Sequence, residues 1–409
     1  MMRLRQATNN KLSAFSFLFS FLFLFLFTLS TQTWAYQHHC PSGNWQSQLL
    51  IHLINVGQGD STFIRTPSGT TILIDAGDLG KGVADVLPTI SKCYKLTSID
   101  YLILTHPHVD HYGGLIDVLK KIKINRAIYD GGDSVLPLTG TTFNKYYQLA
   151  MKPSNAKRRV ANLGNTLVHN DGSNVLFNVV SINAHTTGNN ITRSDNYDYD
   201  SDNDNDNDND NSNNTNEDED IIDDITLNKK NKSASSTTSI NPNSLSLAMV
   251  ISYGKFKYYT GGDLTGAIKA KTPDLESLVA NTIGSVDVMK SNHHGSAGSN
   301  NLYFLSTLKP KHVLVTVGEG GKNLTYHLPN YNIIERMLLL SPIKTIYQTT
   351  VGEMCTSSTD SSDNGTICND SEESLHSNNK IKIENDDIIV VANKNSYSIN
   401  NVNFTTTSR

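Results

Sequence analysis

A dense run of histidine and aspartate directly after an apolar stretch constrains the fold of this chain more than any other feature. Residues 101–104 predict a buried strand, after which His106 and His108 extend to the same side. Asp110 and His111 then face a second position. Imidazole and carboxylate groups without a thiolate indicate a centre for two divalent metal ions, with zinc favoured and manganese or iron as alternatives. The whole run reads Thr105-His106-Pro107-His108-Val109-Asp110-His111-Tyr112-Gly113-Gly114.

Short apolar or alternating segments on both sides of this run predict an α/β domain. Strands are expected at 49–56, 61–66 and 71–75, where glycine and proline mark hairpins, and at 101–104, 175–182, 245–252, 255–260, 286–290 and 313–317. Helical spacing of apolar residues predicts helices at 114–124, 264–270, 302–307 and 332–340. Strands that come first in hairpins and then alternate with helices are typical of a layered α/β domain.

Residues 1–35 have the pattern of a secretory signal peptide. Arg3, Arg5 and Lys11 precede the apolar stretch 15–29, and a cleavage site is expected near Ala35. The alternative is a signal anchor, but the apolar stretch is shorter than the ~20 residues that span a bilayer comfortably. We therefore predict a secreted, extracellular protein without stable membrane insertion after the signal peptide is cleaved.

Four cysteines in the expected mature chain favour two disulfides in an oxidising compartment. Three pairings are possible, and proximity favours Cys355 with Cys368, which leaves Cys40 with Cys93. The alternative is four unrelated buried thiols. Seven glycosylation sequons agree with secretion, although a chain rich in Asn, Ser and Thr also produces sequons by chance. They begin at Asn190, Asn213, Asn231, Asn323, Asn364, Asn369 and Asn403.

Two polar segments interrupt the expected domain. Residues 188–242 include an Asp-Asn repeat and Ser/Thr runs, and they bury too little apolar surface to offset the entropy of ordering, so a disordered acidic insertion is predicted. The repeat lacks the glycine and terminal glutamate of a calcium-binding EF-hand loop. A second polar loop is expected at 357–380. The domain is thus predicted as a single unit built from 36–187 and 243–409.

Further motifs make the chain resemble the metallo-β-lactamase superfamily, and within it the hydrolase domain of ComEC-type DNA-uptake proteins and their free-standing relatives. The resemblance implies a four-layer αββα sandwich that binds two divalent metal ions. It also implies that the final strands, 380–383 and 387–391, form a terminal hairpin. The motifs are Asn55-Val56-Gly57-Gln58-Gly59-Asp60-Ser61, Leu73-Ile74-Asp75-Ala76-Gly77, His106 to His111, Thr260-Gly261-Gly262-Asp263-Leu264 and Asn292-His293-His294-Gly295-Ser296.

The resemblance assigns roles to single residues of these motifs. Asp263 follows a Gly-Gly pair and matches the carboxylate that bridges both metals, whereas an Asp that caps a helix at 264 is the alternative. One of His293 and His294 is expected to ligate the second metal, and His293 is favoured. Asp75 is expected to orient a ligand histidine from outside the metal shell. Asp60 and Ser296 are expected to support the site in the same way.

One ligand of the superfamily has no counterpart here. Many members supply a third histidine to the first metal from a Gly-His dipeptide before the bridging aspartate, and this chain has none. His185, after the expected strand 175–182, is the best-placed substitute, and His169 is the other; an ordinary loop position is the alternative for each. His327 matches a further element of similar proteins, where it would protonate a leaving oxygen or bind an anionic substrate, and a loop histidine beside a turn proline is the alternative.

These residues indicate a hydrolase that uses a metal-activated hydroxide and needs no Ser or Cys nucleophile. The resemblance implies phosphodiester substrates, either small molecules or polymers. Nucleic acid is expected as a substrate only, because the net charge of -5 argues against a polybasic nucleic-acid binder. A basic cluster that would favour a nuclease consists of Lys152, Lys157, Arg158 and Arg159, and a solvated face is the alternative for it. Hydrolysis of a carboxylic ester, lactone or β-lactam is the alternative reaction. A metal-binding pseudo-enzyme or surface interaction protein is the non-enzymatic alternative.

Overall fold

The computed structural model divides the chain into Met1–His39 and a second unit, Cys40–Arg409, which holds the fold. The residues that the structure describes are 40–42, 45–132, 141–152, 155–168, 171–187, 225–226, 239–266, 272–318, 327–352, 356–357, 366–367 and 378–406. The predicted signal peptide at 1–35 therefore lies outside them. Among the described helices, none has the length and apolar character needed to cross a bilayer.

The first sheet has nine strands and carries the N-terminal half of the chain together with its last strands. Its order is β21-β20-β19-β1-β2-β3-β4-β5-β6. The hairpins predicted from the first three segments are present, because β1 pairs with β2 and β2 with β3 in antiparallel register. The strands are β1 Leu49–Leu53, β2 Thr62–Arg65, β3 Thr71–Ile74, β4 Ser98–Ile103, β5 Lys123–Asp130, β6 Arg158–Val160, β19 Ile388–Ala392, β20 Ser396–Ile399 and β21 Val402–Thr405.

The second sheet has eight strands in the order β18-β15-β14-β13-β12-β11-β7-β8. Strands β12, β13, β14, β15 and β18 are parallel to one another, so their carboxyl ends lie at one edge, whereas β11 is antiparallel to β12. The strands are β7 Val175–Ile182, β8 His185–Thr186, β11 Ala248–Tyr253, β12 Phe256–Thr260, β13 Val288–Lys290, β14 His312–Val315, β15 Thr345–Gln348 and β18 Ile381–Ile383.

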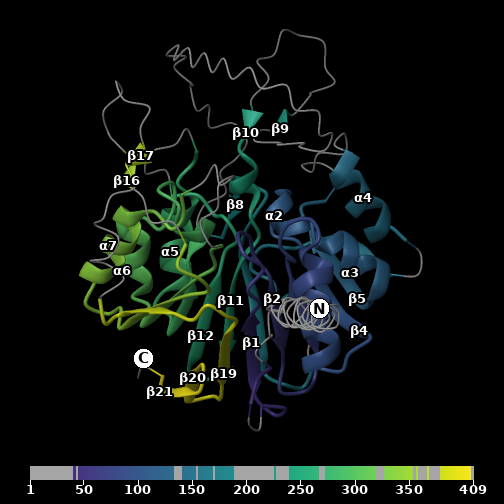
Figure 1. Cartoon of the computed structure of the whole chain (residues 1–409), viewed down its shortest axis with the longest axis horizontal. Coiled ribbons are helices and arrows are strands. Elements are labelled where there is room, and N and C mark those ends of the chain that lie inside the picture. The colour runs from purple at the N-terminus through teal and green to yellow at the C-terminus, as the bar shows by residue number, and fades with distance from the viewer. Residues whose placement is uncertain are drawn as a thin grey trace, which may run out of the picture. The chain divides into compact units, whose positions relative to one another are not determined.

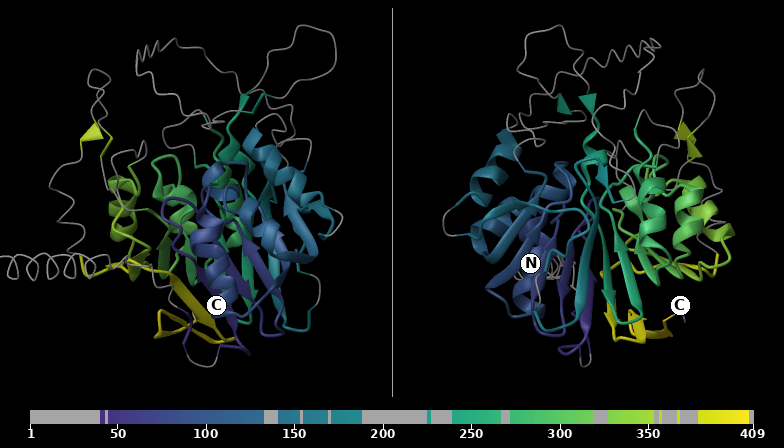
Figure 2. Two further views of the ribbon diagram at one scale, coloured as in Figure 1. Left: turned by 45° about the vertical axis from the view of Figure 1, so that its right-hand side comes forward. Right: turned by 180° about the vertical axis from the view of Figure 1, so that it is seen from behind.

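Alternation along the strands produces three apolar layers. Leu49, Ile51 and Leu53 of β1 belong to a core shared with Phe177 of β7 and Tyr258 of β12, which lies between the two sheets. The opposite faces of the sheets pack against helices in two outer cores. Figures 1 and 2 show the two sets of helices on either side of the strands. The predicted αββα sandwich is thereby confirmed.

Helices cover both outer faces. The first sheet is covered by the π-helical turns η1 and η2 and by α3 and α4, and the second sheet by α5, α6 and α7. The short helix α2 lies at one end of the strands (Figure 1). The bounds are η1 Gly82–Val86, η2 Thr89–Cys93, α2 Val109–Tyr112, α3 Leu115–Lys121, α4 Thr141–Ala150, η3 Pro242–Leu245, α5 Leu275–Ile283, η4 Asn292–Gly295, α6 Leu302–Leu308 and α7 Tyr331–Leu339.

The helix predicted at 264–270 is wrong where the structure describes it. Residues 264–266 are not helical, and Gly266 forms an isolated bridge with Asp274. The helix begins later, at Leu275, because the Asp274 side chain accepts a hydrogen bond from Ser277 N and caps it. The apolar residue Leu264 is buried without belonging to a helix.

The terminal hairpin is also wrong, because its two strands belong to different sheets. Strand β18 pairs with β15 in the second sheet, whereas β19 pairs with β1 in the first. The link between them crosses from one sheet to the other. There the carboxylate of Asp387 accepts hydrogen bonds from Asn55 N (2.6 Å) and from His52 Nε2 (2.7 Å), which are buried residues of the first sheet and its following loop. These partners hold the link against the first sheet.

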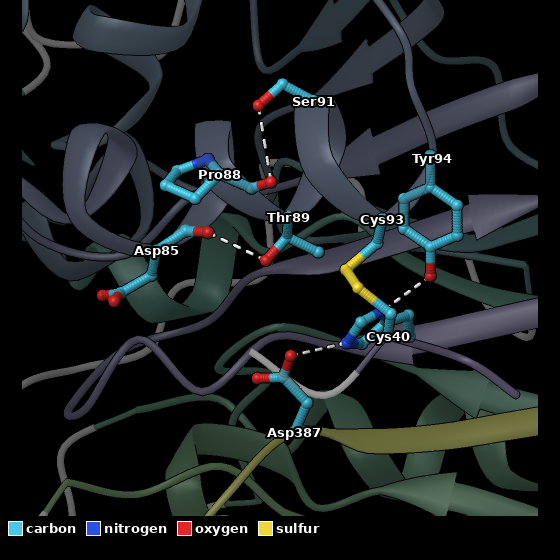
Figure 3. Close-up of a disulfide and its surroundings, with 9 residues drawn as sticks. Cys40, Asp85, Pro88, Thr89, Ser91, Cys93, Tyr94 and Asp387 are labelled. Carbon is cyan, nitrogen blue, oxygen red and sulfur yellow. Dashed lines mark hydrogen bonds and ion pairs between the residues drawn. A yellow bond between two sulfur atoms is a disulfide. The ribbon is translucent and has the colours of Figure 1, made fainter. Parts of the chain in front are cut away.

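Cys40 and Cys93 form a disulfide, with their Cα atoms 5.1 Å apart, as predicted. Figure 3 shows it beside Tyr94, whose hydroxyl donates to His52 Nδ1 at 2.5 Å. The disulfide therefore ties the start of the described chain to the helical layer beside β1. The predicted partners Cys355 and Cys368 lie outside the described residues.

Most of the two predicted polar insertions also lies outside the described residues. Within the first, β9 (Ile225–Thr226) pairs with β10 (Ser239–Ile240). Around the second, β16 (Thr356–Ser357) pairs with β17 (Thr366–Ile367). The described strands before and after each insertion belong to the same two sheets, so the sandwich core is continuous across both.

Candidate metal centre

The histidine-rich run lies at the carboxyl end of β4, where the chain leaves the first sheet and enters α2. His106 and His111 are buried, whereas His108 and Asp110 are half-buried. As the alternation along the chain predicts, His106 and His108 lie together, with His106 Nε2 3.0 Å from His108 Nδ1. The run thus presents several ligand atoms at one end of the sandwich.

Asp75 follows β3, the strand beside β4, and its carboxylate fixes the run from behind. It accepts hydrogen bonds from Thr105 N (2.8 Å) and Thr105 Oγ1 (2.7 Å). His111 Nδ1 donates to the same carboxylate at 2.8 Å. A carboxylate bound to one ring nitrogen sets the tautomer of the imidazole and turns the other nitrogen toward a metal. The structure therefore places Asp75 where the sequence expected an orienting residue.

Asp263 reaches the site from the second sheet, at the end of β12. Gly262 has a φ of 54°, and a Cβ there would lie 2.8 Å from the Cβ of Thr105. Only glycine allows this close approach of the two segments. As a result the buried Asp263 carboxylate lies between the histidines, with Oδ2 3.5 Å from His106 Nε2 and Oδ1 3.4 Å from His111 Nε2.

The two adjacent histidines after β13 occupy a turn with left-handed backbone. His293 has φ 46° and ψ 49°, and His294 has φ 50° and ψ 23°. His294 Nδ1 donates to the Thr316 carbonyl at 2.9 Å, which directs its Nε2 into the site. His293 Nε2 lies 3.6 Å from Asp263 Oδ2.

One set of ligand atoms, which we call the inner cluster, consists of Asp110 Oδ2, His111 Nε2, Asp263 Oδ1 and His294 Nε2. His294 Nε2 lies 3.4 Å from the Asp110 oxygen and 3.7 Å from the Asp263 oxygen. His111 Nε2 lies 3.8 Å from the same Asp110 oxygen. Four ligands about 2.0–2.1 Å from one tetrahedral zinc ion lie roughly 3.3 Å from one another, so these separations fit one ion.

A second set, the outer cluster, consists of His106, His108 and Asp263, whose ligand atoms lie within 4.8 Å of one another. The two clusters share the Asp263 carboxylate, one oxygen facing each. The sequence analysis favoured His293 as the ligand of the second metal. The structure instead places His294 beside His111 and Asp110, because the hydrogen bond to Thr316 turns its ring inward.

Unpaired polar atoms indicate that these clusters suit a metal. Three buried atoms of the inner cluster, His111 Nε2, Asp263 Oδ1 and His294 Nε2, have no hydrogen-bond partner. Burial of unpaired polar groups is costly, and bound cations are one way to satisfy them. Nitrogen and carboxylate donors without thiolates suit zinc, manganese or iron. The residues present therefore fit two divalent ions.

Charges within the site shift the titration of its members. Burial opposes ionisation of Asp263, but His111, His293 and His294 lower the pKa of this carboxyl well below its ordinary value. Burial also opposes a charge on His111, yet Asp263, Asp110 and Asp75 raise its pKa well above the ordinary value. A metal ion at the inner cluster would require the neutral imidazole of His111 and would oppose this rise in its pKa.

Comparison with known proteins agrees with this geometry. Residues 54–187 match the family model of the metallo-beta-lactamase superfamily. The matched region contains Asp60, Asp75 and the histidine-rich run, whereas Asp263 and the two histidines after β13 lie outside it.

Two curated proteins are similar in sequence to parts of this chain. "ComE operon protein 3" of Bacillus subtilis is 24% identical over 305 residues, which are 70% of this chain and 30% of that protein. "Recombination protein 2" of Haemophilus influenzae is 32% identical over 95 residues, which are 23% of this chain and 11% of that protein. The chain thus spans less than a third of either relative.

A solved structure with a similar fold is the metallo-beta-lactamase fold protein YhfI from Bacillus subtilis. It is 11% identical, with a TM-score of 0.39, and the match covers 73% of this chain and 95% of that one.

The sequence analysis missed three residues that support the metal centre. Lys290, buried at the end of β13, lies with its Nζ 2.5 Å from Asp60 Oδ2. Thr316 donates a hydrogen bond to Asp60 Oδ1 and accepts one from His294 through its carbonyl. Thr105 holds Asp75. The signal for Lys290 was a lone charged residue at the end of an otherwise apolar strand.

Asp60 lies behind the inner cluster. Its carboxylate is 3.5 Å from His294 Nδ1 and 4.0 Å from His111 Nδ1, so it faces the ring nitrogens that point away from the ligand atoms. Its backbone N donates to Asp110 O at 3.2 Å, which links the glycine-rich loop after β1 to α2. The expected role of Asp60 as support for that loop agrees with this position.

Other predicted residues lie elsewhere. Ser296 closes the turn that contains His293 and His294, which we call the double-histidine turn. Its N donates a hydrogen bond to His293 O at 2.7 Å. His327 is half-buried, and the segment after it packs on this turn, since Asn330 N donates to Gly295 O at 2.9 Å. His185 is exposed on β8 and belongs to neither cluster, so its expected role as a metal ligand is unsupported. His169 lies outside the described residues.

Proposed function

We propose that this chain is a secreted, zinc-dependent hydrolase that cleaves phosphodiesters. The observation that carries the proposal is the Asp263 carboxylate, which presents one oxygen to each of two ligand clusters. Two cations held by one shared carboxylate can contact both the attacking and the leaving oxygen of an in-line displacement at phosphorus.

The residues of the site have separate tasks in this reaction. Two divalent ions bound there supply Lewis acidity and make a water nucleophile available at neutral pH. Asp110, half-buried beside His111 and His294, completes the inner cluster and accepts a hydrogen bond from the nucleophile. His327, in the segment that packs on the double-histidine turn, supplies a proton to the leaving oxygen.

The charges around the site favour an anionic substrate. Asp60, Asp75, Asp110 and Asp263 carry four negative charges, and Lys290 offsets one of them. Two divalent ions therefore leave the centre with one net positive charge. Without the ammonium of Lys290 the centre would be neutral and would attract a phosphodiester less.

Nucleic acid is one candidate phosphodiester. The name "Recombination protein 2" connects that relative with DNA, which supports this choice. The basic cluster supports it less, because Arg158 is paired with the buried Asp130 at 2.5 Å and lies over the Tyr147 ring. Lys152, Lys157 and Arg159 remain exposed. A small phosphodiester therefore stands beside nucleic acid as a substrate.

The test uses the secreted, purified protein. Its metals are counted by elemental analysis, and the same sample is assayed on bis(p-nitrophenyl) phosphate, single-stranded DNA and nitrocefin. Asp110→Ala removes an inner ligand, and Asp117→Ala on α3 is the matched control, since Asp117 contacts Lys120 and not the site. We expect about two zinc ions per chain and phosphodiester cleavage that Asp110→Ala abolishes and Asp117→Ala keeps.

Other results would contradict the proposal in distinct ways. Turnover of nitrocefin alone would indicate attack at carbonyl carbon. Bound metal without turnover of any of the three substrates would leave a metal-binding protein without the proposed phosphodiesterase activity. Absence of bound metal would refute the hydrolase itself, and retention of the protein on cell membranes would refute its secretion.

A further inference from the structure

A buried network of hydrogen bonds lies beside the disulfide and outside both metal-binding clusters (Figure 3). The Tyr94 hydroxyl donates to His52 Nδ1 at 2.5 Å, so the ring proton lies on Nε2, which donates to Asp387 Oδ2 at 2.7 Å. All three side chains are buried. Burial and the charge of Asp387 raise the pKa of Tyr94, which therefore keeps its proton. The network joins the end of η2, strand β1 and the link before β19.

The carboxylate of this network also holds the start of the loop after β1. Asp387 Oδ1 accepts a hydrogen bond from Asn55 N at 2.6 Å. The Asn55 side chain accepts one from Gly57 N at 3.1 Å, which shapes the first turn of the loop, and donates to Thr349 O at 3.5 Å. Thr349 follows β15 of the second sheet, so Asn55 is bound to both sheets. The position of Asn55 therefore depends on Asp387.

The loop that begins at Asn55 packs directly on the inner cluster. Gly59 has a φ of 125°, and a Cβ there would overlap the backbone O of Asp110. Asp60 N donates to the same oxygen at 3.2 Å. A displacement of this loop would therefore move both an inner ligand, Asp110, and the Asp60 carboxylate behind the inner histidines.

The opposite end of the network lies against the disulfide. Tyr94 directly follows Cys93, which is bonded to Cys40. The Tyr94 ring stacks on Phe63 of β2, with 4.2 Å between the ring centroids, and meets the Trp45 ring edge-on at 5.4 Å. The disulfide thus holds the segment before β1 close to Tyr94 and restrains the ring whose hydroxyl begins the network.

We propose that Tyr94, His52 and Asp387 form a positioning network for the metal centre. The network transmits the restraint of the disulfide to Asn55, and Asn55 fixes the loop that packs on Asp110. Opening the disulfide would loosen Tyr94, then the loop, and would weaken metal binding at the inner cluster. This inference rests on the metal centre of the proposed function, but the order of the loop can be measured without any metal.

The variants break the network at different points. Asp387→Ala removes the carboxylate that holds the loop, and Tyr94→Phe removes the hydroxyl and keeps the stacked ring. His52→Leu removes both hydrogen bonds of the imidazole, whereas the amide of His52→Gln can still donate to Asp387. Cys40→Ser combined with Cys93→Ser opens the disulfide and leaves no thiols there that would bind zinc.

The matched control is Asp171→Ala, at the other end of β2 from the loop. Asp171 accepts hydrogen bonds from Thr66 Oγ1 and Ser68 Oγ, both at 2.6 Å. Its loss removes hydrogen bonds of a carboxylate without touching the network. Urea denaturation measures the unfolding free energy of every variant, so that effects on the loop are compared with the loss of global stability.

Two measurements follow the loop and the metal separately. Hydrogen exchange of residues 55–60, read by mass spectrometry on the metal-free protein, reports the order of the loop. We expect about tenfold faster exchange in Asp387→Ala and in His52→Leu, because a buried hydrogen-bonded carboxylate is lost or left without its partner. Tyr94→Phe and the disulfide variant should show smaller increases. His52→Gln should restore most of the protection, and Asp171→Ala should leave exchange unchanged.

Chelator competition on the zinc-loaded protein measures the affinity of the inner ion. It should fall in the same order among the variants, by about tenfold in Asp387→Ala, the lower end of the range for partners beyond the ligands. Tyr94→Phe keeps the test decisive if Asp387→Ala does not fold.

Three results would overturn the inference. One is loop exchange in the network variants that rises no more than in Asp171→Ala at the same loss of stability. Another is a disulfide variant whose loop is as protected as in the wild type. The third is a faster-exchanging loop with unchanged zinc affinity, which would separate the loop from the metal centre. A wild-type protein that binds no zinc would instead count against the proposed function, and the exchange measurement would still test the link from the disulfide to the loop.

Discussion

The inner and outer clusters share one carboxylate but differ in burial and support. Both imidazoles of the inner cluster are fully buried, and each donates its Nδ1 hydrogen to a fixed acceptor, Asp75 or the Thr316 carbonyl. In the outer cluster His106 is buried too, with its Nδ1 3.1 Å from Thr105 Oγ1, but His108 is half-buried and its Nε2 has no hydrogen-bond partner. Because outer hydrogen bonds fix ligand orientation, we infer that the inner site binds its ion more tightly and that the outer site faces the substrate.

The largest effect is expected for Asp263→Asn, which removes the carboxylate that the clusters share. Two cations close together need this negative charge, so both ions should be lost. Phosphodiester cleavage should fall at least about a thousandfold, since the metals supply several kcal/mol to the transition state. Zinc content and the rate on bis(p-nitrophenyl) phosphate measure both effects. Retention of one ion would show that the clusters are independent.

The next effect is expected for Lys290→Met, which should destabilise the inner side of the site. The ammonium of Lys290 pairs with Asp60 where both are buried, and its loss leaves an unpaired buried carboxylate. Such a loss costs roughly 3–5 kcal/mol of unfolding free energy. Urea denaturation measures it. The double variant Lys290→Met with Asp60→Asn should recover part of the stability, and no recovery would argue against the pair.

A third prediction concerns the support of the double-histidine turn. The buried Glu276 accepts hydrogen bonds from Asn292 Nδ2 (2.7 Å) and Asn300 N (2.6 Å), on either side of the turn. Burial raises the pKa of Glu276 to about 7, above its ordinary value of 4.5. The folded protein therefore binds a proton that the unfolded chain releases, and stability should fall as the pH rises from 4.5 to 7. The fall is about 3 kcal/mol.

The matched variant for this prediction is Glu276→Gln, which cannot ionise. Its unfolding free energy should be lower than that of the wild type. Asn301 N donates to the Glu276 carboxylate in the wild type, whereas in the variant it would face the side-chain amide NH2, which is also a donor. The difference between wild type and variant should nevertheless change with pH across this window. A constant difference would contradict the raised pKa.

The smallest effect is expected for Asp75→Asn, which sharpens the difference between the two sites. The change weakens the hydrogen bond that orients His111 and leaves the ligand atoms in place. Loss of such an outer partner typically lowers metal affinity 10–100-fold. Chelator competition should show weaker binding of the inner ion only. Equal weakening of both ions would mean that Asp75 supports the whole centre and not one cluster.

Much of the site could be predicted from the sequence because its motifs follow strands. His106 and His108 follow one strand and could be expected to converge from the alternation of side chains, whereas Asp75 and Asp263 were added by the resemblance of their motifs. The layered fold followed from the same strand pattern. The position of His294 in the inner cluster, where the sequence favoured His293, could not be predicted, because it depends on two left-handed residues and on the Thr316 carbonyl.

Other features depended on partners distant in the chain. The apolar spacing after Asp263 indicated a helix, but Gly266 bridges Asp274 and delays the helix to Leu275. β18 and β19 were predicted as a hairpin because the local sequence does not show that each of them pairs with a distant strand. β18 pairs with β15, and β19 pairs with β1. Lys290 was overlooked because its partner, Asp60, lies in the loop after β1 and is far from Lys290 in the sequence.

Because the chain crosses between the two sheets after β18, part of the first sheet can form only late in synthesis. Strand β1 and the loop after it emerge early from the ribosome, yet their partners β19 and Asp387 come more than 300 residues later. Contacts between such distant residues form slowly and late. A nascent chain that has not reached Asp387 therefore lacks the contact that fixes Asn55, and the loop leading to Asp60 settles only after translation has passed that point.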